Sequence, residues 1–141
     1  MNSIALPRPW LFLGALLVFC AVLMQSNNPA RQASFDTPGV SVPQAIVLID
    51  SGALVIDVRE RSVSAGSHLP GALLIPLEVV AAHLSRMELA KAQTIVVYCN
   101  QGTGRGPAAV QALAEAGFTN VVNLQAGIEG WRGAGMPTVK S

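Results

Sequence analysis

The stretch TIVVYCNQGTGRGP, residues 94–107, decides the fold of this chain. Its first five residues (94–98) are β-branched or aromatic and predict a buried strand. Residues 99–106 contain glycine at every second position from 102 onward and predict a tight loop. Pro107 suits the first turn of a helix that would run to Gly117. A strand, a glycine-rich loop and a helix in direct succession are a building unit of α/β proteins.

The same alternation continues on both sides of this stretch, over residues 41–138. Ser41 is placed to cap a helix that carries apolar residues at helical spacing and ends at Gly52. Because strands that are apolar throughout are typical of parallel sheets covered on both faces, we expect a three-layer α/β domain with a mainly parallel sheet flanked by helices. The remaining predicted elements are strands at 53–58, 73–75 and 121–124, helices at 77–87 and 128–132, and a polar loop at 59–70.

Composition excludes several other classes of protein. The chain has 141 residues, of which 51% are hydrophobic and 12% charged, so it is too apolar for an intrinsically disordered protein. Its net charge is +1, and residues 40–141 carry seven basic and seven acidic side chains. This balance gives no general attraction for nucleic acid. The two cysteines are too few for a disulfide-rich scaffold or a four-thiolate zinc site, and no metal site is predicted.

An apolar segment near the N-terminus predicts a membrane association. The 15 residues from Trp10 to Met24 contain no charged or polar side chain and would span about 22 Å as a helix. Arg8 precedes them, so the N-terminus should stay cytoplasmic while the following domain is exported. We therefore expect a hydrophobic helix over 1–25, acting as a signal anchor or signal peptide, and a flexible linker over 26–40. The domain would then lie outside the inner (plasma) membrane, or in the periplasm or medium after cleavage.

The candidate reactive group is Cys99, which follows the strand at 94–98. Ligands of parallel α/β sheets bind beyond the carboxyl ends of the strands. The glycines after Cys99 can turn backbone N–H groups inward, and the following helix N-terminus and Arg105 add positive charge. These features should hold Cys99 as the nucleophilic thiolate, although a lone cysteine is often only a small buried apolar residue. The predicted site comprises Cys99, Asn100, Gln101, Gly102, Thr103, Gly104 and Arg105.

Several strings of residues 43–137, taken together, resemble a single rhodanese homology domain. They are LIDSGALVIDVRE (48–60), GSHLPGALLIPL (66–77), TIVVYCNQGTGRG (94–106), AEAGFTNVVNLQAGIEGW (114–131) and GMP (135–137). The resemblance implies a sulfurtransferase in which Cys99 carries a persulfide and the backbone amides of 100–105 cradle its outer sulfur. It further implies a small anionic sulfur donor such as thiosulfate, a thiol or cyanide acceptor, and no cofactor. The family's Asp-x-Arg-Glu corner corresponds to Asp57, Arg59 and Glu60, for which structural hydrogen bonding is the expected role.

The loop after Cys99 departs from the common rhodanese pattern. Five residues separate Cys99 from Arg105, where most rhodaneses have four. This length resembles the loop of related cell-cycle phosphatases and eukaryotic arsenate reductases, which surrounds a tetrahedral oxyanion. Tyr98 stands where those enzymes usually have histidine, and no carboxylate lies between Cys99 and Arg105 to act as a general acid. The sequence therefore favours sulfur transfer and leaves an oxyanion enzyme or a catalytically silent binding domain as alternatives.

Overall fold

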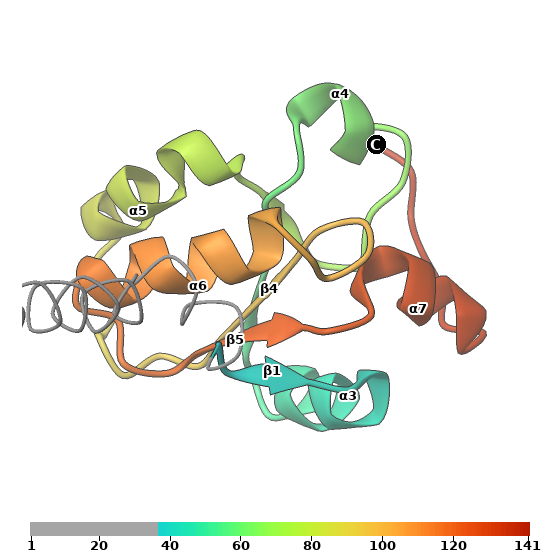
Figure 1. The fold of residues 1–141 in the computed structure, drawn as a ribbon, viewed down its shortest axis with the longest axis horizontal. Helices are drawn as coiled ribbons and strands as arrows, with labels where there is room; N and C mark the ends of the chain where they lie inside the picture. Colours follow the sequence, from blue (N-terminus) through green and yellow to red (C-terminus); the bar gives the residue numbers. More distant parts are fainter. Residues whose placement is uncertain (1–36) are drawn as a thin grey trace, which may run out of the picture. The chain divides into compact units, whose positions relative to one another are not determined.

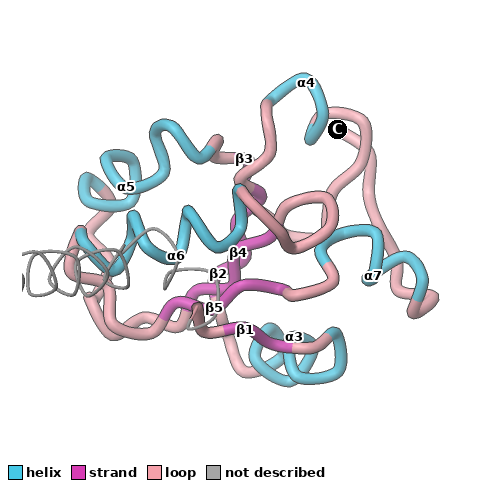
Figure 2. Tube along the Cα trace, in the orientation of Figure 1, coloured by secondary structure: helices cyan, strands magenta, loops and turns pink. Residues whose placement is uncertain are grey.

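The computed structural model describes residues 37–141, which form a five-stranded parallel sheet covered by helices (Figures 1 and 2). The strand order is β1-β5-β4-β2-β3. The strands are β1 (Gly39–Val40), β2 (Leu54–Asp57), β3 (Leu73–Leu74), β4 (Ile95–Tyr98) and β5 (Val121–Leu124). The helices are α3 (Val42–Asp50), α4 (Arg61–Ser64), α5 (Leu77–Arg86), α6 (Arg105–Glu115) and α7 (Gly127–Gly133).

The predicted hydrophobic segment and most of the predicted linker lie outside the described residues. Within residues 37–141, none of the helices has the length and apolar character needed to cross a membrane.

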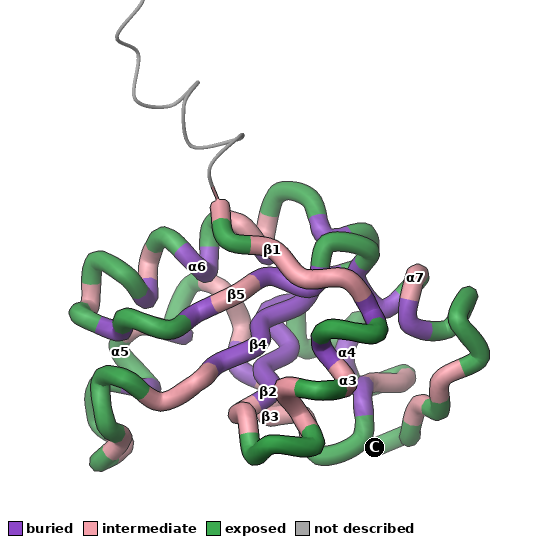
Figure 3. The backbone as a smooth tube through the Cα atoms, turned by 90° about the horizontal axis from the view of Figure 1, so that it is seen from below, coloured by how far each residue is buried: buried purple, intermediate pink, exposed green. Residues whose placement is uncertain are grey.

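Alternating residues of β4 explain why helices cover both faces of the sheet. Ile95 and Val97 belong to an apolar cluster with residues of α5 and α6, whereas Val96 and Tyr98 pack with residues of α3 and α7. All four side chains are fully buried, as expected for a strand with helices above and below it. The central strands accordingly form the buried segments between the helical layers in Figure 3. The predicted three-layer α/β arrangement is confirmed for the described residues.

A local sequence signal fixes the start of α3. The Ser41 side chain accepts a hydrogen bond from the Gln44 backbone, and the Gln44 side chain accepts one from the Ser41 backbone. This reciprocal pair is a capping box, which satisfies two N–H groups that helix geometry leaves free. It confirms Ser41 as the cap of the first helix that the sequence predicts.

Most predicted elements shift by only one or two residues at their ends, and three differences bear on the fold or the site. Gly39 and Val40, which the sequence assigns to the linker, pair with β5 as strand β1; two residues are too few for a periodic signal. The predicted polar loop at 59–70 contains the helix α4, a single turn whose apolar content is too small to stand out. Helix α6 begins at Arg105, two residues before Pro107, so the loop after Cys99 is shorter than the sequence suggests.

Candidate active site

Cys99 lies at the carboxyl end of β4, on the floor of a cavity of about 460 Å³. It is 3% exposed, and it belongs to the apolar cluster beneath α5 and α6. It nevertheless lines the cavity together with polar and charged residues. The lining residues are Arg59, Glu60, Val63, Cys99, Asn100, Gln101, Thr103, Arg105 and Glu129.

Close packing between two segments fixes the loop at 99–104. The backbone N–H groups of Ile128 and Glu129 donate to the carbonyl oxygens of Cys99 (2.9 Å) and Asn100 (3.0 Å). Gly102 adopts φ +78°, and a Cβ added there would lie 1.8 Å from the carbonyl oxygen of Gln125. Glycine is therefore required at 102 both for its backbone angle and for the space it leaves. The end of β5 and the start of α7 thus hold the loop in place.

The loop leaves a row of backbone N–H groups without protein partners among the described residues. Among residues 37–141, the N–H groups of positions 100 to 104 donate no hydrogen bond within the protein. Such a run of free amides beside a cavity is suited to an anion. The Cys99 Sγ atom lies 3.2 Å from the Thr103 carbonyl oxygen, which accepts the proton of the neutral thiol.

A buried network connects the end of β2 with the end of β4. The Arg59 guanidinium donates to both carboxylate oxygens of Asp57, at 2.7 to 3.1 Å, and the Tyr98 hydroxyl donates to the same carboxylate at 3.0 Å. Tyr98 also accepts a hydrogen bond from the Leu69 backbone. Burial and the neighbouring Asp57 charge raise the pKa of Tyr98 above its usual value, which keeps the phenol neutral.

Arg59 extends this hydrogen-bond network to the loop at 99–104, which we call the reactive loop. Its remaining donors reach the Asn100 side chain at 3.2 Å and the Ser67 carbonyl at 2.6 Å. Burial alone would lower the pKa of Arg59, but the hydrogen bonds and charge of Asp57 outweigh this effect and raise it. The structural role expected for Asp57 and Arg59 is confirmed. Arg59 in addition lines the cavity and orients Asn100, a role that the sequence does not predict.

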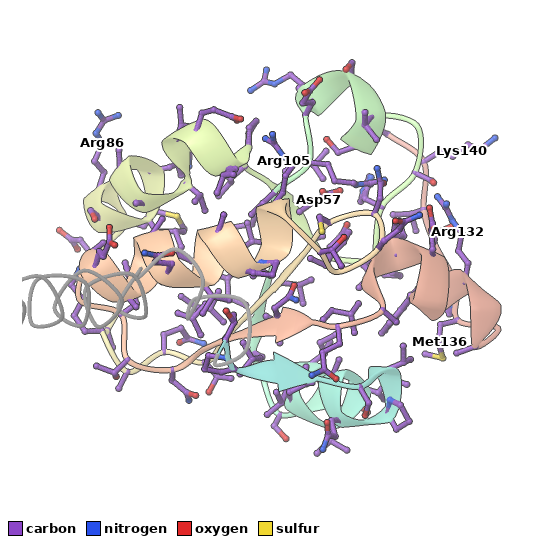
Figure 4. All side chains as sticks on the ribbon, viewed as in Figure 1. Asp57, Arg86, Arg105, Arg132, Met136 and Lys140 are labelled. Atoms are coloured by element: carbon purple, nitrogen blue, oxygen red, sulfur yellow. The ribbon has the colours of Figure 1, made fainter. Side chains whose placement is uncertain are left out.

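Arg105 lines the cavity, yet protein partners engage its guanidinium. Nε donates to the Val58 carbonyl at 2.9 Å, and Nη2 pairs with Glu78 at 2.8 Å. Figure 4 labels Arg105 and Asp57 near the loop that leaves the sheet toward α6. The hydrogen bond from Arg105 lowers the pKa of Glu78. The role of Arg105 in the predicted site stays a prediction, and its positive charge is already paired with Glu78.

Asn123 on β5 holds the loop at 99–104 through a side-chain hydrogen bond. It is buried, and its Nδ2 group donates to the Gly102 carbonyl at 2.9 Å. Its Oδ1 atom has no hydrogen-bond partner among the described residues. A Cβ added to Gly106 would lie 2.1 Å from this oxygen and 3.4 Å from the Cys99 sulfur. The first turn of α6 can therefore approach the sulfur only because residue 106 is glycine.

The structure gathers five of the seven predicted site residues around the cavity: Cys99, Asn100, Gln101, Thr103 and Arg105. Gly102 and Gly104 shape the loop without lining the cavity. Glu129 is a lining residue that the sequence patterns did not reveal, and Glu60 and Arg59 were expected only as structural residues. Ligands of parallel sheets bind beyond the carboxyl ends of the strands. Arg59 and Glu60 follow β2 and Glu129 follows β5, so this rule could have pointed to these three residues.

Comparison with known proteins assigns the family. The model of the rhodanese-like domain matches residues 41–134, and the chain belongs to this family. It is 33% identical over 115 residues to the probable adenylyltransferase/sulfurtransferase MoeZ of Mycobacterium tuberculosis, covering 80% of this chain and 28% of MoeZ. It is 34% identical over 93 residues to the thiosulfate sulfurtransferase GlpE of Pseudomonas entomophila, covering 66% of this chain and 83% of that protein.

Solved structures of the same family share the fold. The human single-domain sulfurtransferase TSTD1 is 30% identical, with a TM-score of 0.62 over 69% of this chain and 96% of TSTD1. A rhodanese-like domain from Anabaena gives a TM-score of 0.66 at 29% identity, over 74% of this chain and 80% of that domain. The chain spans 28% of MoeZ and 48% of a Synechocystis relative that is 35% identical over 88 residues.

Proposed function

We propose that this protein is a rhodanese-type sulfurtransferase that works through a persulfide on Cys99. The observation that carries the proposal is a cysteine on the floor of a cavity, followed by five backbone N–H groups with no partner among the described residues. The names of relatives such as GlpE and TSTD1 support the same chemistry. A site of this kind can hold negative charge on sulfur before and after transfer without rearranging.

The proposed reaction has two steps. The Cys99 thiolate, released from the Thr103 carbonyl, attacks the outer sulfur of an anionic donor such as thiosulfate. The bond between the two donor sulfurs breaks, sulfite leaves with the electron pair, and a Cys99 persulfide remains beside the loop amides. An acceptor thiolate, or cyanide in the laboratory, then takes the outer sulfur and Cys99 leaves as the thiolate. Neither step needs an external oxidant or a second cysteine.

Mass spectrometry of the protein after exposure to thiosulfate tests the proposal. We expect one additional sulfur atom on the peptide that contains Cys99, and its removal by an added thiol. The Cys99→Ser variant should neither gain sulfur nor turn over. Cys20→Ser is the matched control, because Cys20 is the other of the two cysteines in the chain. Turnover that survives in Cys99→Ser would refute the mechanism.

An oxyanion enzyme is the second candidate function. The five-residue loop favours it, and the cavity supplies Glu60 and Glu129 as carboxylates that the loop itself lacks. Assays with p-nitrophenyl phosphate and arsenate beside thiosulfate separate the two activities. Activity toward either oxyanion without sulfur on Cys99 would favour this candidate, and inactivity in all three assays would favour a binding domain.

We also propose that the apolar segment at 10–24 tethers the domain to the outer side of the inner membrane or serves as a cleaved export signal. Fractionation of expressing cells and N-terminal sequencing of the mature protein test this proposal. A cytoplasmic protein that retains its N-terminus and stays out of the membrane fraction would refute it.

A further inference from the structure

The charges around the cavity are divided between a buried floor and an exposed rim. Cys99 and Arg59 are buried, whereas Glu60 and Glu129 are exposed. Both glutamates line the cavity. Backbone hydrogen bonds anchor their positions: the Glu60 carbonyl accepts from the turn of α4, and the Glu129 N–H donates to Asn100. The rim therefore carries two acidic residues whose backbones are held in place beside the cavity.

Within the described part of the chain, the arginines of the cavity are paired with carboxylates, but the two rim glutamates are not paired with cations. Among residues 37–141 the ion pairs are Asp57–Arg59 and Glu78–Arg105. The cavity and its paired groups thus contain two arginines and four carboxylates, a net charge of −2. Among the described residues, Glu60 and Glu129 therefore leave unpaired negative charge at the cavity.

The size of the cavity points to an organic substrate for one of the two steps. About 460 Å³ lies within the range that proteins use for small organic ligands, and an inorganic dianion would fill only a small part of it. The free amides near Cys99 suit the anionic sulfur, whereas the rim suits a cation. The two ends of the cavity therefore favour a molecule with sulfur at one end and positive charge at the other.

We propose that the sulfur acceptor is an organic thiol that carries a positive charge, which Glu60 and Glu129 bind while the thiol sulfur reaches the Cys99 persulfide. This inference rests on the proposed sulfur transfer and defines its acceptor. The acceptor loses its thiol proton to water and bonds to the outer sulfur. The bond to the Cys99 sulfur breaks, and the electron pair stays on Cys99. Glu60 and Glu129 are specificity-determining residues in this scheme.

Transfer from the preloaded protein to three thiols of different charge tests the proposal. The persulfide is formed with thiosulfate, verified by mass, and then mixed with cysteamine, 2-mercaptoethanol or 3-mercaptopropionate in single-turnover reactions. The rate with each charged thiol is divided by the rate with the neutral thiol. Comparing this ratio between proteins cancels the intrinsic reactivity of each thiol.

We expect the cysteamine ratio to fall about tenfold in the Glu60→Gln/Glu129→Gln variant. One unit charge that acts through water across such a cavity changes binding by about threefold, and the variant removes two such charges. The mercaptopropionate ratio should rise. The Glu88→Gln/Glu115→Gln variant is the matched control, since both glutamates are exposed and lie outside the cavity lining. In the wild type, added salt should reduce the preference for cysteamine.

The outcomes separate this inference from the proposed function. If thiosulfate leaves no sulfur on Cys99, sulfur transfer itself is refuted and the inference falls with it. If sulfur loads normally but the ratios are the same in wild type and the Glu60→Gln/Glu129→Gln variant, the inference alone is refuted. A wild-type preference that does not respond to salt would also overturn it, without depending on how the variant folds.

Discussion

Replacing Gly102 by alanine tests whether the packing between the reactive loop and the β5–α7 connection controls the site. Alanine at φ +78° costs about 1–2 kcal/mol. Its Cβ would also lie 1.8 Å from the Gln125 carbonyl oxygen. Backbone must move to relieve that contact, which adds about 1–3 kcal/mol. We therefore expect Gly102→Ala to lose about 3 kcal/mol of unfolding free energy.

Gly71→Ala provides the matched control for this prediction. Gly71 has a similar angle, φ +74°, but an added Cβ there meets nothing within 4 Å. Only the conformational cost of about 1–2 kcal/mol should appear. Urea unfolding measures both losses, and the rate of sulfur loading on Cys99 reports the geometry. We expect loading to slow more than about tenfold in Gly102→Ala and to stay near the wild-type rate in Gly71→Ala. Equal stability losses and equal loading rates would refute the reasoning.

Three further predictions concern the side chains that support the loop. Tyr98→Phe should lower the unfolding free energy by about 2–4 kcal/mol, since it leaves the buried Leu69 N–H without a partner and removes a donor from Asp57. Arg59→Met should cost about 3–5 kcal/mol because Asp57 would remain buried without its cation, and adding Asp57→Asn should restore part of this loss. The lowered pKa of Glu78 means that its ionised form stabilises the folded state above its ordinary pKa of 4.5. The advantage of wild type over Glu78→Gln should therefore be complete at neutral pH and be lost as the pH falls below 4.5.

Controls for these variants come from the same chain. Thr94→Val removes a hydroxyl that accepts an exposed hydrogen bond from Asn120 and should cost less than about 1 kcal/mol. A Tyr98→Phe loss no larger than this would contradict the buried network. If Arg59→Met loses the same free energy with and without the Asp57→Asn substitution, the ion-pair argument is wrong. For Glu78→Gln, a difference from wild type that persists unchanged in acid would show that charge is not its source.

Most of the fold could be predicted from the sequence because its strong signals are local. The apolar run at 94–98 and the glycines after it reveal β4, the loop and α6 without knowledge of the rest of the chain. Cys99 follows from the same signal, since it comes directly after the strand. Strand β1 could not be predicted, because its two residues are defined only by pairing with β5, more than eighty positions later.

The parts of the site that the sequence did not reveal depend on contacts between distant segments. Arg59 reaches Asn100 across 41 positions, and Glu129 enters the cavity because α7 docks its N–H groups on the loop carbonyls. Whether an arginine at a strand end is a surface charge or a buried support is decided by the neighbouring strand. The spacing of residues along the chain does not show which strand that neighbour is.

The strand order also has a consequence for synthesis of the protein on the ribosome. Among the described strands, β1 emerges first but pairs with β5, the last of them to be made. Parallel pairings between distant segments form slowly and leave partly folded chains exposed. Several of the contacts that hold the loop after Cys99 come from Gln125, Ile128 and Glu129, which emerge after the loop itself. A nascent chain therefore cannot assemble its reactive centre until translation of the domain is nearly complete.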